Sequence, residues 1–253
     1  MVHTLGAVVS VAFALFLVVV APMQSRRRFA ALLEAVTTDP TARLRFYRRT
    51  VLRQWPVTLG ALALIGLLTG RGPSNIGVRL PAAGHSLLST GIIVAIIALI
   101  AGGVLVTVVA RRPGGGDILR NAMGPAAVLL PTTARERRVF LLVSVTAGVT
   151  EELAFRGFLL AFMQWVAPDA ARGWLVLASG VAFGVAHVYQ GARGAITTGI
   201  VGALLADTAL SSGSLMLPAV IHTVLDARWS VLPGFGQTVA SPPTAVNAPA
   251  ESI

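Results

Sequence analysis

Two adjacent carboxylates lie in the middle of an apolar stretch of this 253-residue chain. They are Glu151 and Glu152, in the run Glu-Glu-Leu-Ala-Phe-Arg that ends at Arg156. Two later apolar stretches each carry one central histidine, His187 and His222. On insertion scales a charged side chain at the centre of a bilayer costs roughly 2.5–3.5 kcal/mol, so such residues face a protein interior or a watery cavity. The combination predicts a functional site inside a membrane bundle.

The spacing of the charges predicts different environments for the two glutamates. On a helix with about 3.6 residues per turn, Glu152 and Arg156 share a face, whereas Glu151 and Arg156 are separated by about 140°. Arg156 is therefore expected to neutralise Glu152 and to leave Glu151 free to act as a base. The alternative, in which both glutamates form structural ion pairs, lacks cations, because the other basic groups deep in the later spans are the histidines and Arg228.

Each histidine has a candidate partner one helical turn away. Phe183 precedes His187 by four residues, so its ring can pack on the imidazole and fix the rotamer. Asp226 follows His222 at the same spacing, so the carboxylate can accept a hydrogen bond from one ring nitrogen and fix the tautomer. The alternative is that both pairs are purely structural. His187 would then be a hydrogen-bonded core residue, and His222 and Asp226 a buried pair that only holds helices together.

A buried glutamate near a histidine can act as a general base. Burial raises the pKa of a carboxyl group, whereas a neighbouring protonatable imidazole lowers it. Together they give a base that takes a proton from water near pH 7. The product is an activated water, and a peptide bond is its natural electrophile in a protected cavity with an oxyanion donor. The pattern therefore favours peptide hydrolysis inside the membrane.

Other hydrolytic mechanisms make their own demands on the sequence. The His-Glu-x-x-His string of a zinc protease is absent. Ser179 and His187 are eight residues apart, about 12 Å along a helix, which excludes a serine–histidine pair. We expect no cofactor, but a zinc site made from Glu151, His187 and His222 stays an alternative, since two histidines and a carboxylate are a common ligand set.

The composition is that of a membrane protein with several spans. Hydrophobic residues make up 55% of the chain and charged residues 12%, with a mean hydropathy of +0.78, whereas soluble domains are roughly 25% charged. Cysteine is absent, which excludes disulfides, thiol nucleophiles and thiolate metal ligands. The net charge of +10 comes from arginine alone. Because the arginines cluster between apolar spans, they indicate membrane topology, and we expect no nucleic-acid partner.

Hydropathy predicts an all-α bundle of about seven membrane-spanning helices, with a range of six to eight. The windows are close to the ~20 residues needed to cross a hydrocarbon core of ~30 Å. They cover 5–21, 54–70, 86–110, 139–163, 173–190, 195–210 and 214–232. Segment 117–133 is too broken by polar residues and prolines to span, so we expect an interfacial or re-entrant helix there.

The arginine distribution predicts an orientation and a single membrane domain. Region 24–53 carries eight arginines, which places it in the cytoplasm by the positive-inside rule. A second arginine-rich region, 111–138, falls on the same side if seven spans are correct. We therefore expect an outside amino terminus and a cytoplasmic carboxyl terminus, in a bacterial cytoplasmic membrane. Residues 1–232 form the predicted integral membrane domain, and the proline-rich residues 233–253 a disordered tail.

Three motifs in order carry a resemblance to a known family. They read Glu151-Glu152-x-x-x-Arg156, then Phe183-x-x-x-His187, then His222-x-x-x-Asp226, on successive apolar spans. The pattern is similar to that of the CAAX protease and bacteriocin-processing (CPBP) family, also called the ABI family of membrane proteases. The resemblance covers about 139–230, under half of the chain.

The resemblance implies a helical intramembrane glutamic endopeptidase. It implies that Glu151 and His187 activate water, and that His222 with residue 226 stabilises the oxyanion. Many members of the family have Asn at the last motif position, where this chain has Asp226, and an ionised carboxylate offers no donor. Either Asp226 is protonated, or it only orients His222.

The sequence thus predicts an integral membrane endopeptidase that cleaves a membrane-associated peptide by metal-independent, Glu-activated water attack. Its expected partners are a membrane-embedded or membrane-proximal peptide and the lipid bilayer, and the sequence does not fix the oligomeric state. The alternatives are a non-catalytic membrane protein such as a bacteriocin-immunity or scaffold protein, a zinc-dependent protease using the same residues, and a proton-coupled transporter.

Overall fold

The computed structural model describes residues 2–81 and 90–231, and in these residues the chain is helical, without strands. The helical bundle predicted from the sequence is therefore confirmed. The long helices are α1 (Val2–Leu15), α2 (Ala21–Ala35), α3 (Ala42–Thr69), α4 (Thr90–Ala110), α6 (Ala134–Glu151), α8 (Arg172–Ala186), α9 (Gly191–Ser212) and α10 (Met216–Val231). Shorter helical segments are η1 (Phe16–Val20), η2 (Pro73–Ile76), α5 (Gly115–Met123), η3 (Gly124–Leu129), η4 (Glu152–Leu159), α7 (Leu160–Val166) and η5 (Val188–Gln190).

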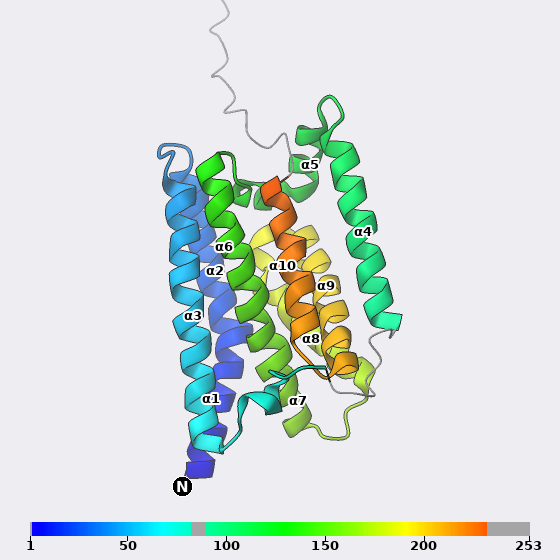
Figure 1. Ribbon diagram of the computed structural model, residues 1–253. Coiled ribbons are helices and arrows are strands. Elements are labelled where there is room, and N and C mark those ends of the chain that lie inside the picture. Colours follow the sequence, from blue (N-terminus) through cyan, green and yellow to red (C-terminus); the bar gives the residue numbers. More distant parts are fainter. Residues whose placement is uncertain (1, 82–89, 232–253) are drawn as a thin grey trace, which may run out of the picture.

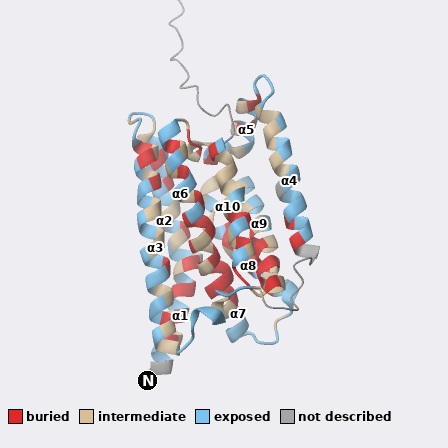
Figure 2. Cartoon of the chain, in the orientation of Figure 1, coloured by how far each residue is buried: buried red, intermediate tan, exposed pale blue. Residues whose placement is uncertain are grey.

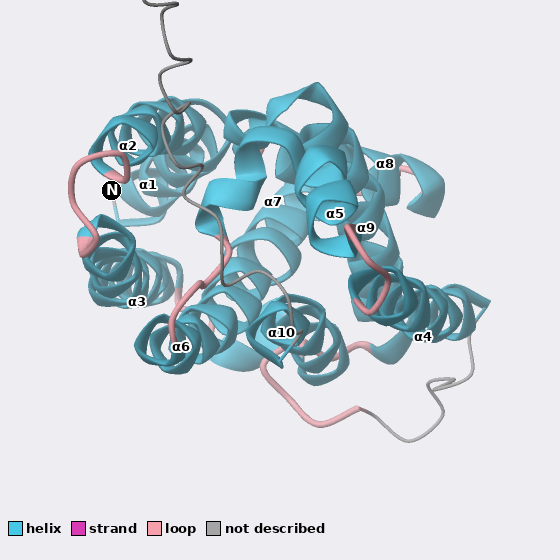
Figure 3. Cartoon of the chain, turned by 90° about the horizontal axis from the view of Figure 1, so that it is seen from above, coloured by secondary structure: helices cyan, strands magenta, loops and turns pink. Residues whose placement is uncertain are grey.

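The helices run roughly parallel or antiparallel to one another in a single bundle (Figure 1). Helix α6 packs against α3 on one side and α10 on the other, and α9 packs against α8, α4 and α10. The view along the bundle shows α6 and α10 between α3 and α4 (Figure 3). This arrangement brings the carboxyl end of α6 next to α8, α9 and α10, the helices that carry the histidines or contact them.

Four of the described helices are long and apolar enough to cross a membrane, namely Thr4–Ala35, Ala42–Thr69, Ile92–Ala110 and Val188–Ser212. Helix α8 is apolar but shorter. The continuous helix α6–η4–α7 carries Glu151, Glu152 and Arg156 in its middle, which lowers its hydropathy. It and α10 lie alongside the four spans (Figure 1). The count of seven spans remains a prediction.

The outward faces of the bundle suit a lipid environment. Large apolar side chains such as Leu67 on α3, and Ile97 and Leu105 on α4, are exposed, and the buried residues concentrate on the helices between them (Figure 2). Soluble monomers rarely expose such continuous apolar surface. An integral membrane protein is the consistent reading.

The first two predicted spans differ from the helices observed. The first helix does not end at residue 21 but continues through η1 and α2 to Ala35, and α3 begins at Ala42 rather than at residue 54. Arginine is a good helix former, and its long side chain carries the charge to water at the membrane surface. The helices therefore extend beyond the apolar windows that hydropathy detects.

The arginine-rich segments lie at one end of the bundle, which we call the arginine end. It contains the carboxyl ends of α2 and α4, the amino ends of α3 and α6, and α5 (Figure 1). Segment 117–133 is confirmed as non-spanning, since α5 and η3 are short helices there. The amino end of α1 and the carboxyl end of α10 lie at opposite ends of the bundle (Figure 1). Which end faces the cytoplasm remains a prediction, and the predicted tail, 233–253, lies outside the described residues.

Helix α6 begins at this end with a capping box. The Glu136 backbone N–H donates to Thr133 Oγ1 at 3.1 Å, and the Thr133 N–H donates to Glu136 Oε2 at 3.2 Å. Glu136 also accepts from Thr132 and pairs with Arg43 of α3 at 3.3 Å. Burial alone would raise the pKa of Glu136. The hydrogen bonds from Thr132 and the charge of Arg43 together lower it by more than burial raises it, so the pKa lies below its ordinary value. These contacts fix α6 against α3.

Candidate active site

Glu152 and Arg156 form a buried ion pair, as their four-residue spacing predicts. Arg156 Nη1 donates to Glu152 Oε1 at 2.8 Å, and the two side chains are 0% and 1% exposed. Arg156 Nη2 also donates to the Gly202 carbonyl of α9 at 2.9 Å. The guanidinium therefore ties the middle of this helix to α9 and neutralises Glu152.

The helix changes its hydrogen-bonding pattern at this ion pair. From Glu152 to Leu159 it is π-helical, between α6 and α7. A π-helical turn is wider than an α-helical one, and such turns often occur at functional sites. The angle of 140° between Glu151 and Arg156 assumed a uniform α-helix, so that value does not apply. The two glutamates nevertheless have different hydrogen-bond partners, since Arg156 and His222 bond to Glu152 and Gln54 donates to Glu151.

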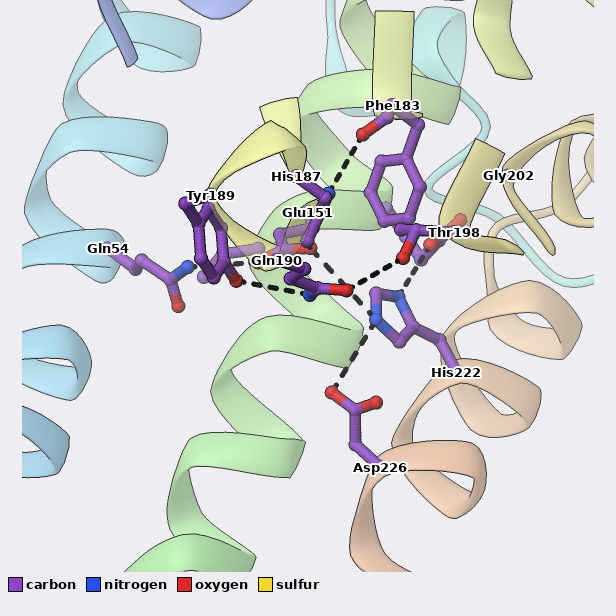
Figure 4. A network of polar contacts seen from close by, with 12 residues as sticks. Gln54, Glu151, Phe183, His187, Tyr189, Gln190, Thr198, Gly202, His222 and Asp226 are labelled. Atoms are coloured by element: carbon purple, nitrogen blue, oxygen red, sulfur yellow. Dashed lines mark hydrogen bonds and ion pairs between the residues drawn. The ribbon is translucent and has the colours of Figure 1, made fainter. Parts of the chain in front are cut away.

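Glu151 is the more accessible of the two carboxylates. Its side chain is 18% exposed, and its Oε1 accepts a hydrogen bond from Gln54 Nε2 of α3 at 3.0 Å. The second oxygen, Oε2, lies 3.7 Å from His187 Nε2 and 4.0 Å from His222 Nε2 (Figure 4). Oε2 is buried and has no hydrogen-bond partner among the described residues.

His187 lies at the carboxyl cap of α8, where the helix ends, and not in the middle of a span as predicted. Its Nδ1 is 2.8 Å from the Phe183 carbonyl oxygen. Because a carbonyl only accepts, Nδ1 carries the proton, and in the neutral ring Nε2 presents a lone pair toward Glu151. Irregular backbone at membrane depth is tolerated where it is enclosed by protein or lines a watery cavity.

His222 is held by Glu152. Its Nδ1 lies 2.8 Å from Glu152 Oε1, the oxygen that also pairs with Arg156. A carboxylate paired with a guanidinium accepts, so Nδ1 of His222 carries a proton and Nε2 faces Glu151. The prediction that Asp226 fixes this tautomer is wrong, because Asp226 Oδ2 lies 3.7 Å from Nε2, beyond hydrogen-bonding distance. Asp226 is a neighbour of the site, 41% exposed.

Phe183 packs against three of the polar groups, which confirms its predicted contact with His187. The two ring centroids are 4.6 Å apart, and the edge contact with His222 is at 5.8 Å. The Arg156 guanidinium lies over the same ring at 4.1 Å, within the range of a cation–π contact. One fully buried aromatic ring therefore orients both imidazoles and the arginine.

The geometry bears on the zinc alternative. No group of three or more His, Asp and Glu side chains in residues 2–81 and 90–231 is arranged to hold a metal ion. Of the residues proposed for such a site, His187 and His222 each place Nε2 within 4.0 Å of Glu151 Oε2. Metal independence remains a prediction that needs chelation to test it.

Two functional contacts could not be found from the sequence. Gln54 lies at the edge of an arginine-rich segment, far from the motifs in the chain, and nothing in its spacing points to Glu151. Gly202 acts through its backbone carbonyl, which leaves no side-chain signal. All of the predicted site residues that belong to the three motifs lie within this one cluster.

A segment in the second half of the chain matches a known protein family. A family model described as type II CAAX prenyl endopeptidase Rce1-like matches residues 134–228. No curated protein and no solved structure is similar enough to the chain to match it. The matched segment runs from the first residue of α6 into α10 and contains every residue of the three motifs. The resemblance to the CAAX proteases is therefore confirmed for residues 134–228, which match the Rce1-like type II CAAX prenyl endopeptidase model.

Proposed function

We propose that this protein is an intramembrane glutamic endopeptidase in which Glu151 is the general base. The family match supports a CAAX-type membrane protease, and the geometry supports the roles of individual residues. The observation that carries the proposal is the position of Glu151 Oε2, a buried acceptor that faces the Nε2 atoms of both His187 and His222. These contacts, 3.7 Å and 4.0 Å, are longer than direct hydrogen bonds, and in the proposal a water that enters with the substrate joins the groups.

In the proposed reaction, a water between Glu151 and His187 attacks the peptide carbonyl carbon. Glu151 takes one proton from the water as the new C–O bond forms, while neutral His187 accepts a hydrogen bond at Nε2 and orients the water. The carbonyl oxygen becomes an oxyanion. Breakdown of the tetrahedral intermediate breaks the C–N bond, and protonated Glu151 donates its proton to the leaving amine.

The oxyanion needs a donor, and His222 is the best placed. With Nδ1–H held by Glu152, a doubly protonated imidazole presents its second N–H from Nε2 toward the reacting carbonyl. Removing a comparable donor in other hydrolases lowers kcat by roughly 10²–10³-fold. The roles of His222 and Glu152 are therefore distinct, with His222 stabilising the oxyanion and Glu152 holding the imidazolium in place by its Nδ1–H.

The substrate class follows from the environment and from the family. The site lies within a bundle of apolar helices, so the substrate is a peptide in or beside the membrane. The family description names prenyl endopeptidases, which makes a peptide with a prenylated carboxyl-terminal segment the first candidate to compare with its unprenylated form.

The proposal is tested by replacing Glu151 with Gln, which is nearly isosteric but not basic. Membranes from cells producing the wild type, Glu151→Gln or no protein are compared for new peptide termini by mass spectrometry. We expect termini that depend on the wild type and are lost with Glu151→Gln. Glu34→Gln, the same change at an exposed position of α2, should behave as the wild type. If the membrane-inserted wild type and Glu151→Gln give the same termini, the protein is not a Glu151-dependent protease. An immunity or scaffold protein would give this result.

Exhaustive chelation separates the glutamic mechanism from the zinc alternative. We expect the wild type to keep its activity after chelator treatment and removal of free metal. Loss of activity that zinc restores would assign the same residues to a metal site.

A further inference from the structure

Gln54 lies outside the matched family segment and contacts the proposed base, Glu151. It lies on α3, which packs against α6, and its Nε2 donates to Glu151 Oε1 at 3.0 Å. Figure 4 shows the amide reaching Glu151 from α3, whereas His222 and Asp226 come from α10. The site is therefore assembled from both halves of the chain.

The contact decides which oxygen of Glu151 faces the histidines. A glutamate carboxyl group rotates about a broad terminal torsion, so its two oxygens can exchange unless one is held. Gln54 holds Oε1, and Oε2 is left facing His187 and His222. A carboxylate fixed in this way needs no rotation before it takes a proton from a bound water.

The other end of the Gln54 amide is not satisfied. Its Oε1 is buried and has no hydrogen-bond partner among the described residues. Leaving such an acceptor unpaired costs about 1–3 kcal/mol. The opposite amide orientation would place the carbonyl oxygen against the Glu151 carboxylate, so an ionised Glu151 requires the donor orientation. The orientation of the Gln54 amide is thus set by the hydrogen bond from Nε2 to Glu151, and not by any partner of its carbonyl oxygen.

We infer that Gln54 is a positioning residue of the active site, which holds the ionised Glu151 carboxylate with one oxygen toward the attacking water. The inference rests on the proposed function, since it assigns Gln54 a role in proton transfer by Glu151. It also assigns a catalytic contribution to α3, which the family match does not include.

The test uses the substrate found for the wild type and two substitutions of Gln54. Gln54→Met keeps the length of the side chain and removes the donor. We expect kcat to fall by roughly 10- to 100-fold with little change in KM, as for loss of a hydrogen bond to a charged group. The acid limb of the pH–rate profile should move to higher pH, because the ionised base loses a stabilising donor.

Gln54→Glu gives the opposite pH response. A protonated carboxyl at this position still donates to Glu151, whereas an ionised one repels it, because adjacent carboxylates share one proton. We expect activity to be retained at low pH and to fall as the pH rises.

Trp55→Phe is the matched control. It removes another hydrogen bond between the same two helices, from Trp55 Nε1 to Thr146 Oγ1 at 3.1 Å, without touching Glu151. We expect it to leave the pH–rate profile unchanged. If Gln54→Met and Trp55→Phe have the same kcat and profile, Gln54 only packs the helices and the inference is wrong. If Glu151→Gln is itself active, the proposed function fails first, so the two failures are distinguishable.

Discussion

His222 Nδ1 lies 2.8 Å from Glu152 Oε1, the same oxygen that receives Arg156. Glu152 therefore joins the structural part of the site to the chemical part. Its ion pair with Arg156 anchors the helix to α9, and its contact with His222 sets which ring nitrogen faces Glu151. The two adjacent glutamates differ in task because Glu152 is fully buried and paired with Arg156, whereas Glu151 is partly exposed and makes no such pair among the described residues.

Replacing Glu152 with Gln should destabilise the protein strongly. The change leaves the Arg156 charge buried without its counter-ion, and breaking a buried pair in this way costs about 3–5 kcal/mol. The measurement is thermal unfolding of the purified protein in detergent. Glu151→Gln is the control, since Glu151 makes no ion pair with Arg156 among the described contacts, and it should unfold near the wild-type temperature. Equal stability of Glu152→Gln and the wild type would contradict the role of this pair.

Replacing Asp226 with Asn should preserve activity. Because Glu152 rather than Asp226 holds Nδ1 of His222, the substitution leaves the imidazole in place, and the amide adds a donor that is present at every pH. We expect kcat within about tenfold of the wild type, with less dependence on pH at the acid end. Steady-state kinetics from pH 5 to 9 provide the measurement. An inactive, normally folded Asp226→Asn variant would show that the carboxylate itself takes part.

Adding a methyl group at Gly202 should disturb the packing around Arg156. A Cβ at this position would lie 2.9 Å from Phe183 Cβ and 3.1 Å from Arg156 Nη2. Overpacking of this kind costs about 1–3 kcal/mol, so Gly202→Ala should lower both the unfolding temperature and kcat. Gly60→Ala is the matched control on α3, where a Cβ meets no atom within 4 Å. A stable and fully active Gly202→Ala variant would contradict the tight fit.

Glu136 should make the stability of the arginine end depend on pH. Since the folded state lowers the pKa of Glu136 below its ordinary value of 4.5, the ionised carboxylate stabilises the fold above the unfolded pKa. This stabilisation is lost as the pH falls through the lower folded pKa. The difference in unfolding temperature between the wild type and Glu136→Gln should be largest near neutral pH and shrink below about pH 4. A difference that does not vary with pH would contradict the contribution of the charge.

The contacts predicted correctly from the sequence are those within one helical turn. The Glu152–Arg156 pair and the packing of Phe183 on His187 both follow from four-residue spacing, and the apolar windows located most of the helices. Spacing along one helix did not predict which carboxylate binds the His222 ring, because a residue on another helix can lie closer. Asp226 is four residues from His222, yet Glu152, on a different helix, lies closer.

The remaining features depend on tertiary packing. The π-helical segment from Glu152 to Leu159 has no periodic signature of its own, and only the surrounding helices show where the turn widens. Gln54 meets Glu151 because α3 lies against α6, and the end of α8 at His187 is visible only in the backbone. Hydropathy also cannot place helix ends beyond the hydrocarbon, where arginines continue α2 and α3.

Helix α3 makes repeated side-chain contacts with the matched segment or the short element leading into it. Arg43 bonds Glu136, Tyr47 bonds the Leu129 carbonyl, and Gln54 and Trp55 bond Glu151 and Thr146. The segment that defines the family is therefore not a separable module. A fragment reduced to residues 134–228 would retain the three motifs and lose the scaffold that aligns them.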